Sequence, residues 1–105
     1  MVNTMRIEDI VKILKDNMTT NKNDSRQIIK YKNNVDYGNE IGIVLSNIDK
    51  STFEVFIHAK INKEVISQLL YSTFTNIDEA TQYYNKLENY ITNFDLEGIV
   101  NEIKN

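Results

Sequence analysis

Two stretches of alternating apolar and polar residues, separated by a short polar segment, constrain the fold of this chain more than any other feature. Apolar side chains occupy every second position from Ile41 to Leu45, and again from Phe53 to Ala59. The residues between them, 47–51, read Asn-Ile-Asp-Lys-Ser and are typical of a turn. A period of two with a turn between the runs predicts an antiparallel hairpin.

The C-terminal part has a helical period instead. From Ala80 to Phe94, apolar and tyrosine side chains recur at spacings of three and four and cover about 120° of a helix. Asn76, followed three residues later by Glu79, predicts a capped helix start. The pattern resumes on a shifted face over 96–103, which predicts a second short helix or a kinked continuation. Gly98 should weaken that segment by about 1 kcal/mol relative to alanine.

The N-terminal part is predicted as a helix over about 4–17, a polar loop over 19–25 and an edge strand over 26–32. Strict alternation in this strand places Arg26, Ile28 and the two lysines on one face. Residues 33–39 contain turn formers. Residues 61–74 suit either a helix or a fourth strand after a turn at 62–63, and we favour the strand.

These elements predict one α+β domain over residues 1–105. It has an N-terminal helix, an antiparallel meander of three or four strands, and two C-terminal helices packed on the sheet. A chain of 105 residues suits one domain. No segment resembles a signal peptide or a membrane span, so we expect a cytoplasmic protein that does not bind membranes.

The residue types that commonly act in catalysis do not form a recognised catalytic arrangement in this sequence. The chain has no cysteine, its three glycines are scattered, and His58 is the only histidine. Alternation places His58 beside Glu54 on the polar face of a strand, where a surface role is the ordinary one. Asp36 and Glu40 could meet across a turn, but without the spacing of a known metal loop. We therefore expect no enzyme activity, no metal and no cofactor.

Charge is uneven along the chain. Residues 1–32 carry +3, residues 33–75 carry −2 and residues 76–105 carry −4. A solvated helix face explains this balance most simply, while a basic partner protein is the functional alternative. Tyrosines are favoured interface anchors, and two of them lie at one edge of the apolar stripe. The alternative is that these tyrosines are peripheral core residues with hydroxyls at the surface. The candidate partner-binding residues are Glu79, Tyr83, Tyr90, Asp95, Glu97 and Glu102.

Two other functions stay open. Cationic side chains around an aromatic residue on the first strand could bind nucleic acid; these residues are Arg26, Lys30, Tyr31 and Lys32. Lysines that protect a sheet edge explain the same pattern, and the overall charge of −3 opposes non-specific DNA affinity. The third possibility is a homo-oligomer that pairs through the second helix or an exposed sheet edge, so the protein is expected to be a monomer or a homodimer.

A family resemblance follows from the order of elements and the composition. The chain is small and free of cysteine, it contains fifteen asparagines and fifteen isoleucines, and its acidic C-terminal helices carry tyrosines. In these respects it resembles small phage-encoded inhibitor proteins of the anti-CRISPR type. The resemblance implies an inhibitor or adaptor of a larger host protein, such as a defence nuclease with a basic surface. It carries over no individual residue.

Overall fold

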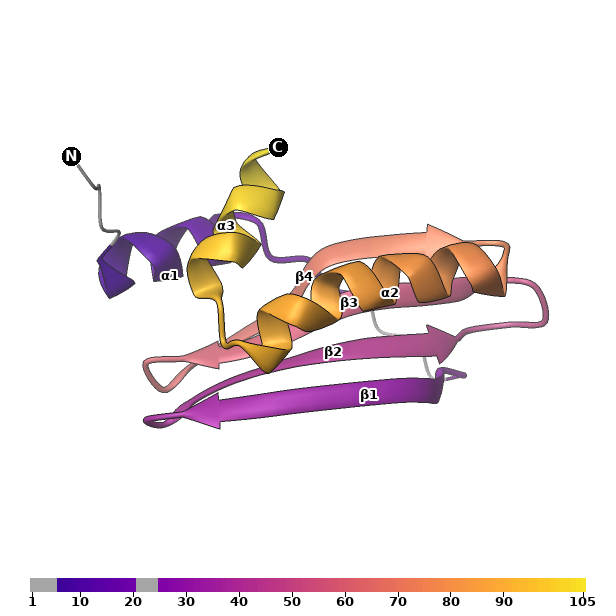
Figure 1. Ribbon diagram of the computed structural model, residues 1–105, viewed down its shortest axis with the longest axis horizontal. Helices are drawn as coiled ribbons and strands as arrows, with labels where there is room; N and C mark the ends of the chain where they lie inside the picture. Colours follow the sequence, from indigo (N-terminus) through magenta and orange to yellow (C-terminus); the bar gives the residue numbers. More distant parts are fainter. Residues whose placement is uncertain (1–5, 21–24) are drawn as a thin grey trace.

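The computed structural model describes residues 6–20 and 25–105 of the chain. These residues form three helices and one four-stranded sheet (Figure 1). In chain order the elements are α1 (Ile7–Asp16), β1 (Gln27–Asp36), β2 (Asn39–Asn47), β3 (Phe53–Ile61), β4 (Glu64–Phe74), α2 (Ile77–Thr92) and α3 (Leu96–Lys104). The predicted α+β class and element order are confirmed.

The sheet is an antiparallel meander with the strand order β1-β2-β3-β4. The predicted hairpin is its centre: β2 and β3 pair without irregularity from Glu40 opposite Lys60 to Asn47 opposite Phe53. Residues 64–74 form the fourth strand that we favoured over a helix. Its pairing with β3 shifts register twice, at points where Gln68 and Leu70 adopt positive φ. These bulges explain why the period of two is hard to see in that segment.

Two of the three connections are two-residue turns. Tyr37 and Gly38 have φ of 48° and 81°, and Asn62 and Lys63 have φ of 55° and 66°. Positive φ at both central residues is the turn geometry that matches the twist of paired strands. The turn predicted at 62–63 is confirmed. The predicted turn over 33–39 is too long, because β1 continues to Asp36.

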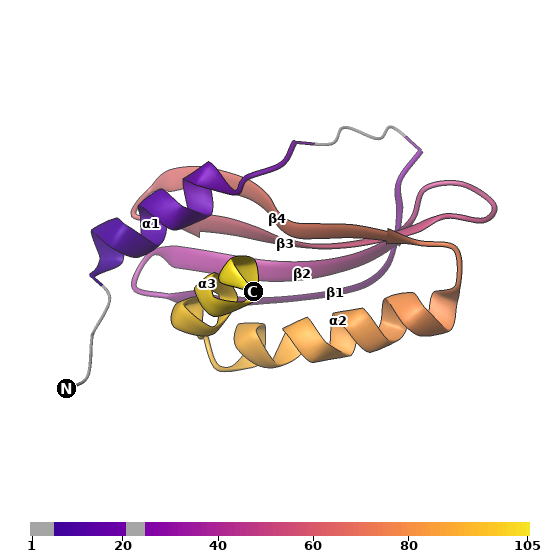
Figure 2. The same cartoon turned by 90° about the horizontal axis from the view of Figure 1, so that it is seen from above.

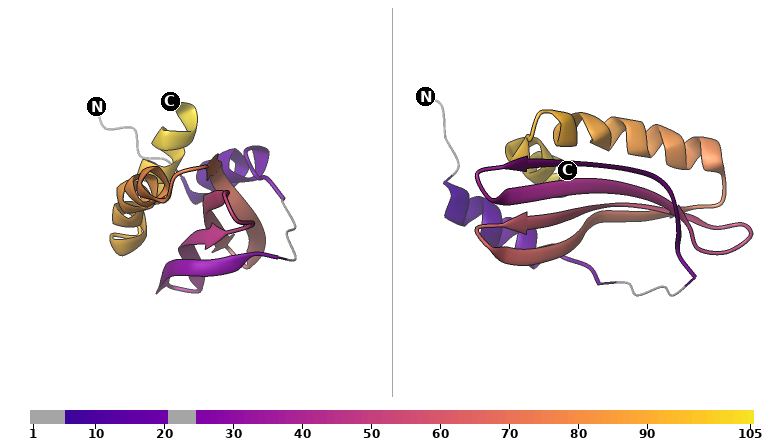
Figure 3. Two further views of the ribbon diagram at one scale, coloured as in Figure 1. Left: turned by 90° about the vertical axis from the view of Figure 1, so that its right-hand side faces the viewer. Right: turned by 90° about the horizontal axis from the view of Figure 1, so that it is seen from below.

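One face of the sheet holds the core. Apolar side chains from β2, β3 and β4 meet those of all three helices in a single cluster. In the end-on view at the left of Figure 3, α2 and α3 lie on one side of the curved sheet. α2 runs along the strands, and α3 lies between α2 and α1 (Figure 2). The largest fully buried side chains of this cluster include Tyr84, Leu14, Ile57, Leu69, Leu87 and Ile91.

The start of α2 follows a local sequence signal. The side chain of Asn76 accepts hydrogen bonds from the N–H groups of Asp78 and Glu79, at 2.7 and 3.3 Å, which confirms the predicted cap. α1 is a helix over Ile7–Asp16, within the predicted 4–17; residues 4 and 5 lie outside the described residues. None of the helices in the described ranges is long and apolar enough to cross a membrane.

Candidate protein-binding surfaces

A tight elbow joins α2 to α3 and carries most of the predicted partner-binding residues. Phe94 has φ of 49°, its N–H donates to the carbonyl of Ile91 (3.2 Å), and the N–H of Asp95 donates to the carbonyl of Tyr90 (2.8 Å). This pair of bonds is the Schellman motif, with phenylalanine at the position where glycine is usual. The Asp95 carboxylate then accepts from the N–H of Gly98 (2.9 Å) and caps α3. The elbow therefore ends one helix and begins the next, so residues 96–103 are a separate helix.

Tyr90 is held rigidly in this elbow. Its hydroxyl donates to Glu102 Oε1 at 3.1 Å, and Glu102 Oε2 lies 3.3 Å from Lys86 Nζ. Burial raises the pKa of Tyr90, and the hydrogen bond to Glu102 and the negative charges of Glu102 and Asp95 raise it further. The phenol is thus a neutral donor fixed among carboxylates. It is half-buried, with no freedom to reorient without losing this bond.

Gly98 is required by the packing of Tyr90. A Cβ atom at position 98 would lie 2.5 Å from Asp95 Oδ2 and 2.7 Å from two ring carbons of Tyr90. We expect Gly98→Ala to lower the free energy of unfolding by about 1–3 kcal/mol, because the cap or the ring must move. Helix propensity alone predicts the opposite sign, a gain of about 1 kcal/mol. Urea denaturation measures the change, and Asn101→Ala, at an exposed position of α3, is the matched control.

The six predicted residues extend from the first turn of α2 through the elbow into α3. Tyr83 lies near the middle of α2, where its hydroxyl donates to the carbonyl of Leu70 (3.1 Å) and its ring packs on Phe74. Glu79 and Tyr90 are eleven positions apart in α2, a rise of about 16 Å along the helix axis. The elbow holds Tyr90, Asp95 and Glu102, with Glu97 exposed in the first turn of α3.

The alternative nucleic-acid residues are divided between the two faces of the sheet. A register shift between Ile28 and Lys30 turns the strand, so that Tyr31 pairs with Val44 while Lys30 pairs with Leu45 of the core face. Lys30 Nζ lies 5.0 Å from the ring centroid of Tyr84 on α2. The predicted shared face of Arg26, Ile28 and the lysines is therefore wrong, because a bulge interrupts the alternation.

Arg26 instead pairs with a buried carboxylate on the face away from α2. Its guanidinium donates to both oxygens of Glu54, which is fully buried, and lies 5.0 Å from the ring centroid of Phe56. Ser46 Oγ donates to Glu54 Oε2 at 2.5 Å, and the hydroxyl of Tyr71 donates to Oε1 at 2.6 Å. This set of residues, Arg26, Ser46, Glu54 and Tyr71, is here called the Glu54 network.

The pKa values of the Glu54 network favour a structural role over a catalytic one. Burial alone would raise the pKa of Glu54, but the hydrogen bonds from Arg26, Ser46 and Tyr71 outweigh it and hold this pKa below its ordinary value. Burial and the bond to Glu54 raise the pKa of Tyr71 to about 12. At neutral pH neither group exchanges its proton readily, so the network does not suit general acid–base chemistry. The alternation of residues 53–60 predicted that Glu54 lies on a polar face exposed to solvent. This prediction is wrong, because Glu54 is fully buried.

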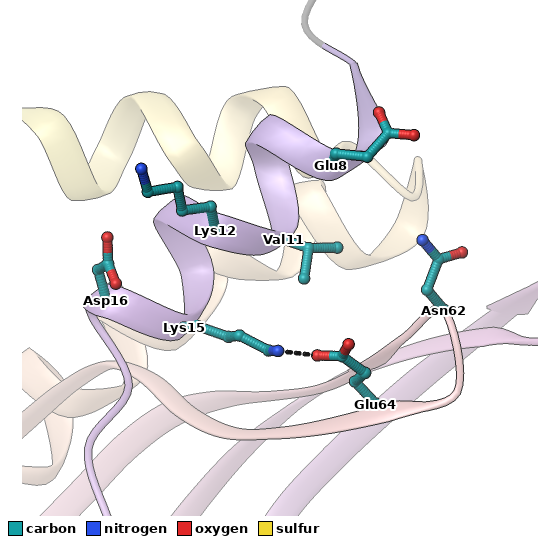
Figure 4. Close-up of a pocket in the computed structure, with 7 residues that line it drawn as sticks. All are labelled: Glu8, Val11, Lys12, Lys15, Asp16, Asn62 and Glu64. Carbon is teal, nitrogen blue, oxygen red and sulfur yellow. Dashed lines mark ion pairs between the residues drawn. The ribbon is translucent and has the colours of Figure 1, made fainter.

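A depression with a volume of about 350 Å³ lies between α1 and the start of β4 (Figure 4). Its lining mixes both charges, and Lys15 forms an ion pair with Glu64 across it. It is lined by Glu8, Val11, Lys12, Lys15, Asp16, Asn62 and Glu64. Across residues 6–20 and 25–105, no three His, Asp or Glu side chains gather as metal ligands would. His58 lies elsewhere, with Nε2 3.5 Å from Glu40 Oε1.

Strand β1 exposes a surface with apolar side chains, Ile28 and Val35 among them, that belong to none of the sites predicted from the sequence. Nine of its ten residues are exposed, among them Ile28, Tyr31 and Val35 with exposed fractions of 62%, 47% and 59%. All three point away from the helices, since their partners on β2 are Ser46, Val44 and Glu40. The sequence signal was present as apolar residues within a lysine-bearing edge strand.

Comparison with known proteins finds no matching family, no matching curated protein and no matching solved structure. The function must therefore be inferred from two surfaces, the acidic α2–α3 elbow and the exposed strand β1.

Proposed function

We propose that this protein is a small, non-catalytic protein-binding module, encoded by a phage or mobile element, that inhibits or adapts a larger host protein. The observation that carries the proposal is the unbalanced negative charge of the α2–α3 surface. Residues 76–105 hold six carboxylates and two lysines. One of these lysines, Lys86, already pairs with Glu102.

The exposed carboxylates are available to a partner. Glu79 and Glu97 are both exposed, and in the described part of the chain neither lies within ion-pair distance of a lysine or arginine. Removing such charges from water is favourable only when a partner supplies cations, so the surface favours a basic partner. The negative electrostatic field of this surface would also raise the rate of association with that partner.

The elbow between α2 and α3 also supplies a preorganised contact within this negatively charged surface. The ring of Tyr90 is fixed by Gly98 and by its bond to Glu102, so little side-chain entropy remains to be lost on binding. Tyr83 stays a predicted contact, but its hydroxyl and ring are both engaged with β4, so the proposal does not rest on it. The proposed contacts are therefore centred on the elbow residues Tyr90, Asp95, Glu97 and Glu102. Glu79 adds a separate negative charge in the first turn of α2.

A basic groove that normally holds nucleic acid is the kind of partner surface that fits best. A host defence nuclease such as a CRISPR effector has that chemistry, and the resemblance to anti-CRISPR-type inhibitors points the same way. The proposal places the protein in the cytoplasm of the host cell. It requires no cofactor and no membrane.

Charge reversal tests the proposal. The immobilised protein should capture a basic, nucleic-acid-binding protein from a low-GC bacterial lysate, and duplex DNA should displace the captured protein. Glu97→Lys should weaken retention by about tenfold at low salt, and Glu79→Lys by less, because each change removes an attraction and adds a repulsion. Quantitative mass spectrometry of the retained protein gives the measurement.

Glu8→Lys is the control, because it makes the same change of charge at an exposed position of α1. Equal retention by all three variants, or insensitivity of the complex to DNA, would contradict the proposal. A mobility shift of duplex DNA by the protein alone, steeply weakened by salt, would favour the nucleic-acid alternative instead.

A further inference from the structure

The two edges of the sheet differ in their capacity to accept another strand. At the β4 edge, Gln68 and Leu70 adopt positive φ and the pairing shifts register twice. The carbonyl of Gln68 accepts a hydrogen bond from the N–H of Thr19 at 3.0 Å, so the segment that follows α1 already occupies part of this edge. Bulges and covering segments are the devices that block edge pairing.

The β1 edge has neither device over most of its length. From Lys30 to Asp36, β1 pairs with β2 residue by residue without a shift, and within the described chain its other side faces no strand. β1 is the outermost strand, at the bottom of Figure 1 and toward the viewer at the right of Figure 3. A regular, exposed edge with apolar side chains is a template for strand addition.

We propose that this edge pairs with β1 of a second copy of the chain, antiparallel, around a two-fold axis that passes through Asn33. The observation that identifies the occupant is the complementarity of β1 to itself in this register. Tyr31 faces Val35 of the second copy, an aromatic residue against a β-branched one. Lys30 faces Asp36 of the second copy, a pair of opposite charges. The symmetry repeats both pairs, and pairs of these kinds stabilise sheets.

Neighbouring registers are less favourable. Two residues that face each other across paired strands point to the same side of the sheet. The two-fold axis keeps every residue on its own side of the sheet. It must therefore pass between two copies of the same residue. An axis through Lys32 places two lysines opposite each other, which is destabilising. An axis through Asn34 also pairs Lys32 with Asp36, but it places Lys30 opposite Gly38 and Tyr31 opposite Tyr37, both within the turn, and so loses the pair of Tyr31 with Val35.

The lysines of β1 are compatible with this pairing. With Asn33 on the axis, Lys30 meets an aspartate and Lys32 meets Asn34, so no two lysines face each other. Lysines that exclude other strands thus permit a second copy of the same strand, which is how charge patterns give specificity. The acidic elbow is not part of this contact, so the proposal does not depend on the function proposed above.

A single introduced cysteine tests the register. The natural chain has no cysteine, so Asn33→Cys can form a disulfide only with the same residue of a second copy. The register places these two Cα atoms about 4.5–5.5 Å apart, within the range that a disulfide spans. Tyr37→Cys is the control, because Tyr37 is 98% exposed, takes no part in the proposed pairs, and lies about 26 Å from its copy across eight residues of chain. Mild oxidation should link Asn33→Cys into dimers and leave Tyr37→Cys largely unlinked.

Charge exchange gives a second readout. Sedimentation should show a dimer for the natural chain, and Lys30→Asp or Asp36→Lys alone should raise the dissociation constant by about tenfold. The double exchange should restore it, with unfolding curves recorded for each variant to separate folding from pairing. A monomer at all soluble concentrations, or equal cross-linking of the two cysteine variants, would overturn the proposal.

Discussion

Replacing Glu54 with glutamine should lower the free energy of unfolding by about 3 kcal/mol, as measured by urea denaturation at neutral pH. The natural carboxylate is fully buried and accepts hydrogen bonds from Arg26, Ser46 and Tyr71. Glutamine keeps the shape but removes the charge, and it presents an N–H₂ group where an acceptor is needed. The Arg26 guanidinium, mostly buried beside Phe56, then loses its counter-charge.

The same variant should show a defined dependence on pH. Because the pKa of Glu54 is held below its ordinary value, its contribution to stability is complete above about pH 4.3, the value of an unperturbed glutamate. That contribution is lost as the pH falls through the lowered value in the folded state. The difference between the natural chain and Glu54→Gln should therefore shrink on acidification. Glu64→Gln, at a half-exposed ion pair, should change stability by less than about 1 kcal/mol. An equal loss in both variants would contradict the structural role of the network.

Tyr84→Ala should lower the free energy of unfolding by about 3–5 kcal/mol, while Tyr83→Ala, at the adjacent position, should cost less than half of that. The side chain of Tyr84 is 1% exposed within the core between α2 and the sheet, and Lys30 lies over its ring. Its removal leaves a large cavity and exposes the apolar surface around it. Tyr83 is half-buried and loses one hydrogen bond and its contact with Phe74. Chemical denaturation of the two variants measures the difference.

Tyr37→Ala is the control for this pair, since Tyr37 is 98% exposed in the turn between β1 and β2. Its change should be within about 0.5 kcal/mol. Equal losses for Tyr83→Ala and Tyr84→Ala would mean that α2 is rotated about its axis relative to the described packing. Because Tyr83 and Tyr90 both support the fold, alanine substitutions there confuse stability with binding. Tyr90→Phe, which removes only a hydroxyl, is the better variant for binding studies.

Periodicity predicted the elements whose environment is uniform along their length. The hairpin of β2 and β3 packs one whole face on the helices, so its apolar residues recur at every second position. α2 packs one stripe on that sheet, so its apolar residues recur at helical spacing. In both cases each residue's environment follows from its position in the element, which is the condition for a sequence pattern to be readable.

The errors arose where a local interruption changed the environment. The bulge at Ile29 reversed the faces of β1, and the bulges of β4 concealed its alternation. Polar residues in 33–36 resembled a turn, although they pair regularly with β2. Glu54 followed the polar alternation of β3, but its burial depends on Arg26, Ser46 and Tyr71 from three other parts of the chain. Such long-range contacts leave no periodic signal.

The unequal edges of the sheet also determine how large an assembly of this protein can become. Strand addition at two compatible edges would let molecules join without limit and grow into fibres. Here the irregular backbone around Gln68 and Leu70, held by Thr19, offers no second template. Once two molecules have joined through β1, no regular edge is left for a third. Under the proposed pairing, growth would therefore stop at the dimer, so that an exposed apolar strand can persist without seeding polymerisation.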